Sequence, residues 1–160
     1  MIELKNTFKD WKITQLFGWT EYALKMEERR KNTGKRAYIY GIHTGIDFGM
    51  VIGTEIFAPH DGTVVMVDRT DNSGRGIAIS IWDTHQHIGT RYYHLSKIHV
   101  RDGQCIKTGD LIAEVGDSGM SVDGSHLHFE LVRTNDEGKA IGLYNGAIDP
   151  FNKKNVKWVV

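Results

Sequence analysis

The sequence predicts an all-β fold, a sandwich or barrel of short strands, and three observations support this prediction. The chain contains eighteen glycines but only two prolines, which suits many tight turns between strands. Short runs rich in Val, Ile, Tyr and Trp recur along it. Turn-forming pairs such as Asp61-Gly62 and Gly109-Asp110 separate these runs at short intervals, as in all-β domains.

The predicted elements begin with one short helix near the N-terminus. The stretch 21–32 consists of good helix formers and ends before Gly34, so it is the one helical candidate. The window 21–36 also holds six Lys or Arg and three Glu, which indicates either a solvated surface segment or a cleft wall that contacts substrate. Strands are expected at 55–58, 62–68, 76–83, 89–95, 105–109, 111–116 and 126–132.

Length and composition indicate one globular domain at 1–160. Twenty basic and twenty acidic side chains balance, so no global field indicates nucleic acid. The charged start lacks a signal peptide, and no window approaches the ~20 apolar residues of a membrane span. We expect synthesis in the cytoplasm, no membrane insertion, no nucleic-acid partner and a monomer. Cys105 stands alone, which excludes an internal disulfide and predicts a small core residue.

The motif with the clearest chemistry is GSHLHFEL at 124–131. In a strand, His126 and His128 share one face, with neighbouring side chains roughly 6.5–7 Å apart, while Leu127 and Phe129 share the other. The apolar face is explained by the core. The imidazole face requires a partner, which could be a metal, a substrate or an acid.

The best partner is GIHTGIDF at 41–48. On a straight strand His43 and Asp47 would lie roughly 13 Å apart, and the composition does not favour a helix. The chain must therefore bend between them, which Gly45 permits. Together with one histidine of the H-x-H pair they form a two-His, one-Asp set with a fourth position open for water, as in catalytic zinc sites.

The other histidines and the signatures of other catalytic sites are the alternatives to this set. His94, in YYHL, is either a satisfied strand residue or a third member of the site, and the two motifs favour the latter. A second H-x-H, at His85 and His87, lies among turn formers and predicts a hairpin loop. His60 is expected in a turn and His99 on the surface. The chain lacks H-E-x-x-H, G-x-S-x-G and the cysteines of a structural zinc site.

In their order along the chain, GIHTGIDF, YYHL and GSHLHFEL resemble the lysostaphin- and LytM-type zinc metalloendopeptidases, which cut peptidoglycan peptide bridges. The resemblance covers most of the chain, including ITQLFGW, IGTEIFAPHDGTVV, IKTGDLIAEVGDSG and the closing IDPF. It implies a twisted antiparallel sheet with a substrate groove, and one zinc ion bound by His43, Asp47 and His128. It also implies that His94 and His126 are the catalytic histidines.

The mechanism that this implies uses histidines for proton transfer. No Glu directly follows a histidine in this chain, so His94 and His126 together are expected to take the proton from water and to stabilise the oxyanion. Tyr92, two residues before His94, should share its strand face and contact the oxyanion or substrate. Tyr93 should point into the core.

The function predicted is zinc-dependent cleavage of peptide bonds in peptidoglycan cross-bridges or stem peptides. The setting that fits is a bacteriophage lysin or lysin catalytic domain, acting on the cell wall of an infected host or from outside. Two alternatives remain: a catalytically inactive relative that binds cell wall or regulates a hydrolase, and a carrier domain, since APHDGTVV and IKTGDLIAEVG are similar to biotinyl and lipoyl domains. No modified-lysine turn of that kind occurs here.

Overall fold

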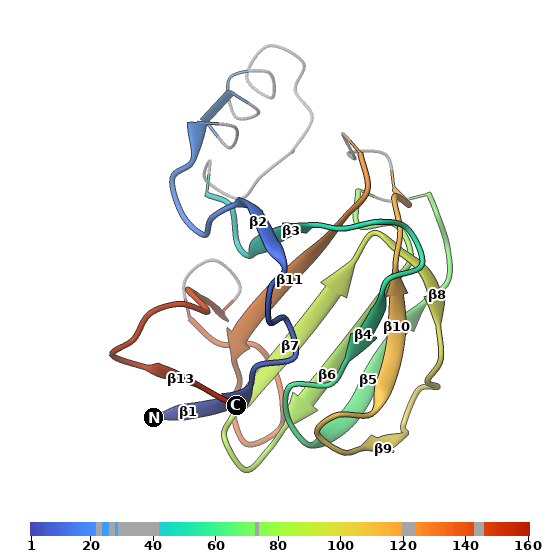
Figure 1. Cartoon of the computed structure of the whole chain (residues 1–160). Helices are drawn as coiled ribbons and strands as arrows, with labels where there is room; N and C mark the ends of the chain where they lie inside the picture. Colours follow the sequence, from blue (N-terminus) through green and yellow to red (C-terminus); the bar gives the residue numbers. More distant parts are fainter. Residues whose placement is uncertain (22–23, 26–27, 29–41, 73, 120–123, 143–145) are drawn as a thin grey trace.

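The computed structural model describes residues 1–21, 24–25, 28, 42–72, 74–119, 124–142 and 146–160 (Figure 1). Its strands are β1 (Ile2–Lys5), β2 (Lys12–Gln15), β3 (Ile46–Gly49), β4 (Glu55–Phe57), β5 (Gly62–Asp68), β6 (Ala78–Asp83), β7 (Ile88–Tyr93), β8 (Leu95–Ile98), β9 (Cys105–Ile106), β10 (Leu111–Val115), β11 (His126–Arg133), β12 (Ala147–Ile148) and β13 (Val156–Val159).

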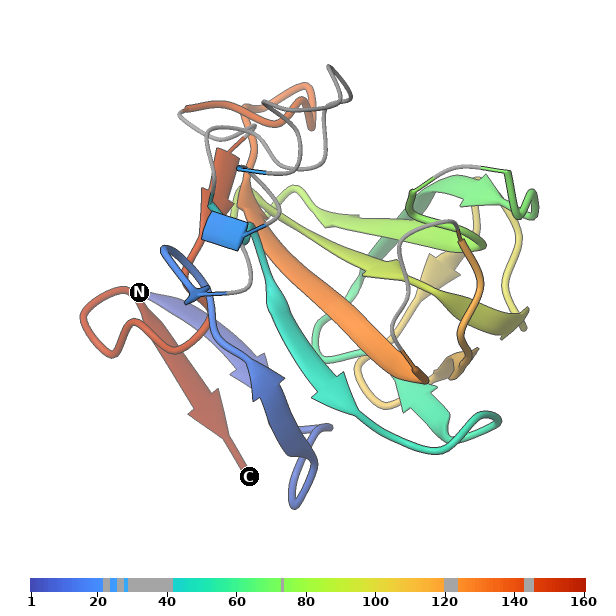
Figure 2. The same cartoon turned by 90° about the horizontal axis from the view of Figure 1, so that it is seen from above.

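These strands form three sheets, of which the largest carries the candidate site. Its strand order is β2-β3-β11-β7-β6-β5-β9, with β12 paired to β11, and its pairs are antiparallel. A three-stranded antiparallel sheet has the order β4-β10-β8. Figure 2 shows successive strands of the large sheet turned relative to one another, as the right-handed twist of strands requires. The predicted all-β, mainly antiparallel fold is confirmed.

One hydrophobic core joins the sheets. Alternate residues of the central strands, such as Ile79 and Ile81 of β6, are fully buried, and they share this core with Ile56 of β4 and Ile112 of β10. Phe8, after β1, packs its ring 4.9 Å from that of Phe129 in β11. The large sheet and the three-stranded sheet therefore form a sandwich, and alternate side chains along each strand point into the core between them.

The two ends of the chain meet in a parallel pair, β1 with β13, and both termini lie on the same side of the molecule (Figure 1). Leu4 and Val156 are buried in the common core. This pair has no counterpart among the predicted strands, because its partners are separated by almost the whole chain.

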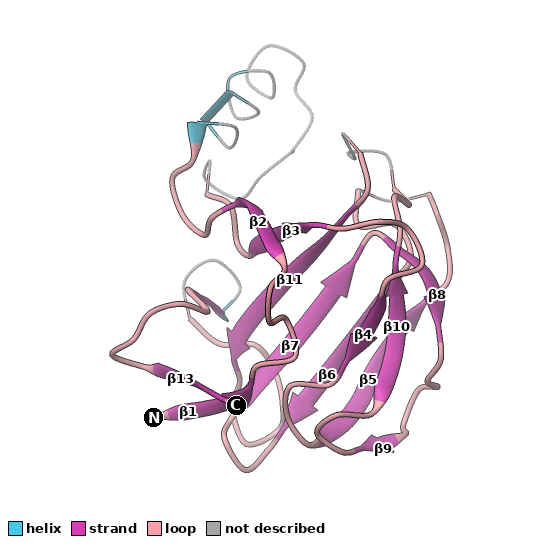
Figure 3. Cartoon of the chain, in the orientation of Figure 1, coloured by secondary structure: helices cyan, strands magenta, loops and turns pink. Residues whose placement is uncertain are grey.

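The predicted N-terminal helix is present where the structure describes it. Glu21, Leu24, Lys25 and Glu28 are helical (Figure 3), and the Leu24 amide donates to the Thr20 carbonyl at 3.0 Å. The rest of 21–36, with most of its basic residues, lies outside the described residues. No helix among the described residues has the length and apolar character to cross a membrane.

Cys105 was expected in the core and is exposed instead. It lies in β9, a two-residue strand at the edge of the large sheet. Of this strand only Ile106 faces inward and is buried.

Candidate metal centre

The register of three adjacent strands determines which side chains meet at the site. In β11, His128 pairs with Asp47 of β3 on one side and with Tyr93 of β7 on the other. Side chains at directly paired positions project from the same face of a sheet. Asp47, His128 and Tyr93 therefore line up across one face, opposite the core.

His43 reaches this face from the loop before β3. Its backbone pairs with that of Gly18, and at Gly45 the chain passes close beside β11 before it enters the sheet at Ile46. A Cβ atom at Gly45 would lie 2.8 Å from Nε2 of His128 and would overlap the Phe129 carbonyl. The bend predicted between His43 and Asp47 is present. Gly45 does not have a left-handed φ, so glycine is needed here because of the close approach and not because of the backbone conformation.

The structure brings together the three residues expected to hold metal. His43 Nε2 lies 3.2 Å from Asp47 Oδ1 and 3.0 Å from His128 Nδ1, and His128 Nδ1 lies 2.8 Å from Asp47 Oδ1. All three side chains are almost fully buried. Ligands on tetrahedral zinc, with bonds of about 2.0–2.1 Å, would be separated by about 3.3 Å. The three atoms are thus already close to the spacing of a metal-bound set.

The hydrogen bonds of the two rings leave acceptor atoms facing the site. His43 Nδ1 is 2.8 Å from the Leu16 carbonyl, and His128 Nε2 is 3.3 Å from Oε1 of Glu130. Those nitrogens must donate, so in the neutral rings His43 Nε2 and His128 Nδ1 carry lone pairs. Two nitrogen lone pairs and a carboxylate oxygen therefore converge, an arrangement that a cation stabilises. The residues present fit a divalent metal.

The ionisation of the site supports the same conclusion. Burial acts to raise the pKa of Asp47, but its contacts with the His128 and His43 rings outweigh burial and hold that pKa well below its ordinary value. Burial acts to lower the pKa of His128, but the carboxylates of Asp47 and Glu130 raise it to about 9. The protein environment thus favours positive charge between these side chains, which a metal supplies when it displaces the proton.

Both predicted catalytic histidines lie beside this set. His94 and His126 have ring centroids 4.7 Å apart. His126 Nε2 is 4.0 Å from Asp47 Oδ1, farther than the mutual spacing of the three converging atoms, and its Nδ1 is 2.9 Å from the Gly124 carbonyl. The two histidines of the H-x-H pair therefore have different positions: His128 joins the three-atom set, and His126 lies next to it.

His94 is held in an unusual backbone conformation. It lies between β7 and β8 with φ of +62°, which is uncommon for a residue other than glycine and recurs at functional sites. Its Nδ1 is 2.8 Å from the Ser118 carbonyl, so Nε2 is left as the acceptor. Burial lowers the pKa of His94 to about 4, and the ring is therefore neutral at pH 7.

The prediction for the two tyrosines was wrong, because His94 interrupts the alternation of β7. Tyr92 is fully buried, pairs with Phe129 on the core face, and donates its hydroxyl to Thr90 Oγ1 at 3.0 Å. Tyr93 faces the site, with its ring parallel to that of His128 at 5.3 Å. The left-handed turn at His94 places that side chain on the face opposite the one that period-two counting assigns from Tyr92.

Glu130 is the residue of this site that the sequence reasoning missed. It is buried on the same face of β11 as His126 and His128. Burial acts to raise the pKa of Glu130, but its hydrogen bond to His128 and the neighbouring charges of His128 and Arg91 lower it to about 2. The period of two that linked the histidines would have extended to this position.

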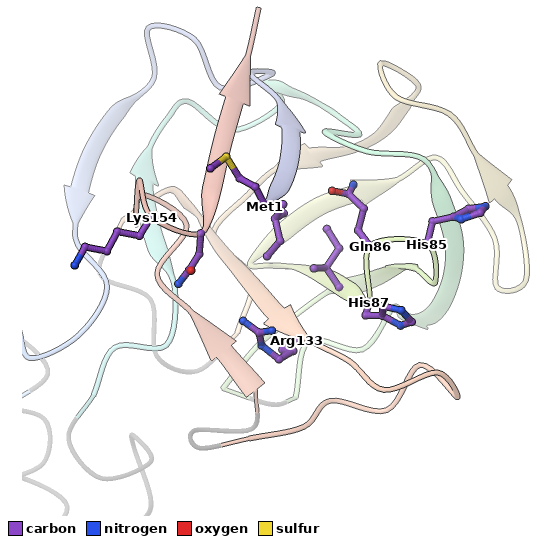
Figure 4. Close-up of a pocket in the computed structure, with 9 residues that line it drawn as sticks. Met1, His85, Gln86, His87, Arg133 and Lys154 are labelled. Atoms are coloured by element: carbon purple, nitrogen blue, oxygen red, sulfur yellow. The ribbon is translucent and has the colours of Figure 1, made fainter.

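The second H-x-H lies in the hairpin between β6 and β7, as predicted. His85 and His87 are exposed, and His87 Nδ1 lies 3.3 Å from the exposed carboxylate of Asp136. Both line a pocket of about 580 Å³. Figure 4 shows them beside the other labelled lining residues, Met1, Gln86, Arg133 and Lys154. Ile88, the first residue of β7, lines this pocket, whereas Tyr93 is the last residue of β7. The pocket therefore lies at the opposite end of the strand from the metal centre.

The two remaining histidines have structural partners. His60, expected in a turn, is buried, with Nε2 2.9 Å from Thr90 Oγ1 and Nδ1 2.7 Å from the Asp61 carbonyl. His99 is exposed, as predicted, and its Nε2 lies 2.8 Å from Glu114 Oε1. Neither lies in the metal set.

Comparison with known proteins gives consistent matches. Residues 41–142 match the family model described as Peptidase family M23. The peptidoglycan DD-endopeptidase ShyA of Vibrio cholerae is 42% identical over 90 residues, which are 56% of this chain and 20% of ShyA. The chain thus spans about a fifth of that relative, and about a quarter of an uncharacterized metalloprotease of Haemophilus influenzae that is 37% identical over 120 residues.

Two solved structures extend the similarity to the fold. The catalytic domain of lysostaphin from Staphylococcus simulans superposes with a TM-score of 0.68 at 25% identity, over 89% of this chain and 91% of that one. A zinc-containing peptidase from Vibrio cholerae gives a TM-score of 0.63 at 29% identity, over 88% of this chain and 36% of that one. Since the family model covers the segments that carry His43, Asp47, His94, His126 and His128, the chain belongs to peptidase family M23.

Proposed function

We propose that this chain is a zinc-dependent endopeptidase that cleaves peptide bonds in the cross-bridges or stem peptides of bacterial peptidoglycan. The observation that carries the proposal is the convergence of His43, Asp47 and His128 beside two further histidines. Three protein ligands with a fourth position left for water are typical of catalytic zinc sites. Relatives named as a peptidoglycan endopeptidase and a zinc-containing peptidase support the substrate and the metal.

The ligand set would hold one zinc ion through His43 Nε2, Asp47 Oδ1 and His128 Nδ1. Zinc bound there would act as a Lewis acid on the scissile carbonyl and would lower the pKa of a bound water towards neutrality. The buried imidazoles and carboxylate would supply the metal with ligands that are already deprotonated or readily become so.

His94 and His126 would carry the proton transfer. His94 donates its Nδ1–H to the Ser118 carbonyl, and His126 donates its Nδ1–H to the Gly124 carbonyl. Both rings therefore offer Nε2 to the site. Within the described residues, the carboxylates at this face are Asp47, proposed as a ligand, and Glu130, which already bonds four donors. The two histidines are therefore the groups left to accept the water proton and, once protonated, to donate to the oxyanion.

The proposed setting is the bacterial cell wall, where the chain would act as a bacteriophage lysin or as the catalytic part of one. The decisive experiment digests purified peptidoglycan with the protein before chelation, after chelation and after zinc is restored. Mass spectrometry of the released fragments identifies the bond. Zinc-dependent release of peptides supports the proposal. Peptidoglycan that stays intact in the presence of zinc-loaded protein contradicts it, and this is the result expected of an inactive relative that only binds the cell wall.

A further inference from the structure

We propose that Glu130 is the positioning residue of this metal centre, a role that rests on the proposed metal site. Its carboxylate would select the nitrogen through which His128 binds metal. It would also tie the loop that carries His43 and Asp47 to strand β11. Glu130 does not belong to the converging set itself.

The contacts of Glu130 are those of a buried, fully bonded carboxylate. Oε1 accepts from His128 Nε2 at 3.3 Å and from Thr44 Oγ1 at 2.5 Å. Oε2 accepts from Arg91 at 3.0 Å and from the Tyr93 hydroxyl at 3.3 Å. Four donors from three segments of the chain therefore fix its position, and a buried charge with this many partners is rigid.

The bond to His128 determines the tautomer of that ring. A neutral imidazole carries one N–H, and a carboxylate opposite Nε2 keeps the proton there, which leaves the Nδ1 lone pair for the metal. Tyr93 stacks parallel on the ring at 5.3 Å and so restrains its tilt, but stacking does not distinguish the two nitrogens. Among the described contacts of Nε2, the one that makes this distinction comes from Glu130.

The bond to Thr44 extends the same control to the other ligands. Thr44 lies between His43 and Asp47, next to Gly45, which approaches the His128 ring closely, and its hydroxyl donates to Glu130. A shift of the Glu130 carboxylate would therefore move the loop of the first two ligands and the ring of the third together. Partners of metal-bound histidines usually alter metal affinity by about 10–100-fold when mutated.

The test is Glu130→Gln, which keeps the shape of the side chain and removes its charge. Zinc affinity is measured by competition with a chelator, and the coordination geometry by the visible absorption of the cobalt(II)-loaded protein. We expect zinc to bind about 10–100-fold more weakly, with an altered cobalt spectrum. The matched control is Glu114→Gln. Glu114 also accepts a hydrogen bond from a histidine, His99, at 2.8 Å, but this pair does not belong to the metal centre. This control should bind zinc and cobalt as the wild type does.

A purely structural role would give a different result. It would lower the melting temperature of the metal-free protein and leave zinc affinity and the cobalt spectrum at their wild-type values, which would overturn the inference. If Glu130→Gln does not fold, Tyr93→Phe decides, since it removes one donor to Glu130 and keeps the stacked ring. A smaller loss of zinc affinity is then expected, and unchanged affinity contradicts the role.

The outcome also separates this inference from the proposed function. Wild-type protein that binds zinc but leaves peptidoglycan intact, with weakened zinc binding in Glu130→Gln, would reject the proposed activity and retain the role of Glu130. Wild-type protein that binds no zinc would reject both. Active wild type beside a Glu130→Gln variant with normal zinc and cobalt binding would reject the inference alone.

Discussion

His126 and His128 are two residues apart on one strand face, yet the structure predicts different effects on zinc binding when each is replaced by alanine. His128 Nδ1 is 2.8 Å and 3.0 Å from the other two ligand atoms, whereas His126 Nε2 is 4.0 Å from Asp47 Oδ1. His128→Ala should therefore lose zinc and activity together, because it leaves two protein ligands. His126→Ala should retain zinc and lose most of its hydrolysis.

The size of the second effect follows from the contacts of His126. Its Nδ1 is held by the Gly124 carbonyl and its ring lies 4.7 Å from that of His94, so it is oriented for proton transfer. General acid–base help contributes about 10²–10⁴-fold, which corresponds to roughly 2.7–5.5 kcal/mol of activation free energy. Turnover of His126→Ala should fall by at least ~10²-fold, and that of His94→Ala should fall similarly. The double variant should lose less than the product of the two singles.

The assay measures zinc content by elemental analysis alongside the initial rate on purified peptidoglycan. His85→Ala and His87→Ala are the matched controls, because they alter an H-x-H of the same spacing in the exposed hairpin. Both should keep wild-type zinc and activity. Full zinc content in His128→Ala, or a near-normal rate in zinc-loaded His126→Ala, would refute the division of the pair.

Three further predictions concern residues around the centre. Tyr92→Phe should leave hydrolysis near the wild-type rate and cost about 0.5–1.5 kcal/mol of stability by denaturant unfolding, because its hydroxyl bonds Thr90 in the core; a rate loss of ~10²-fold or more would restore its oxyanion role. Gly45→Ala should weaken zinc binding and cost about 1–3 kcal/mol, since its Cβ would lie 2.8 Å from His128 Nε2; unchanged zinc affinity would contradict the close approach. Burial lowers the pKa of His60, so the unfolded chain binds a proton at His60 more readily than the folded chain. The contribution of His60 to stability is therefore complete above about pH 6.5 and is lost as the pH falls below that value. Metal-free His60→Gln should therefore show a smaller drop in melting temperature than metal-free wild type between about pH 7.5 and 5.5; equal drops would exclude His60.

The sequence predicted the strands of the sandwich well where alternation and turn residues coincide, as in 62–68 and 126–132. The spacing of His43 from Asp47 and of His126 from His128 also predicted a set of two histidines and one aspartate, and the resemblance, not the spacing, selected His128 as its second histidine. Sequence reasoning missed β1 and β13, because their parallel pairing depends on contacts between chain ends. The formation of such a pair depends on the entropy cost of closing a long loop and on packing between residues far apart in the sequence, so no local sequence pattern predicts it.

The reversed tyrosines show where period-two counting fails at a functional site. Counting from His94 assumes that every residue of YYHL has extended backbone, but His94 has φ of +62°. Counting from His128 across the register gives the correct answer, since its partner in β7 is Tyr93 and the partner of Phe129 is Tyr92. The strained residue is one of the proposed catalytic histidines. The left-handed turn that misleads the alternation also brings His94 beside His126, because an extended residue there would continue β7 along the sheet.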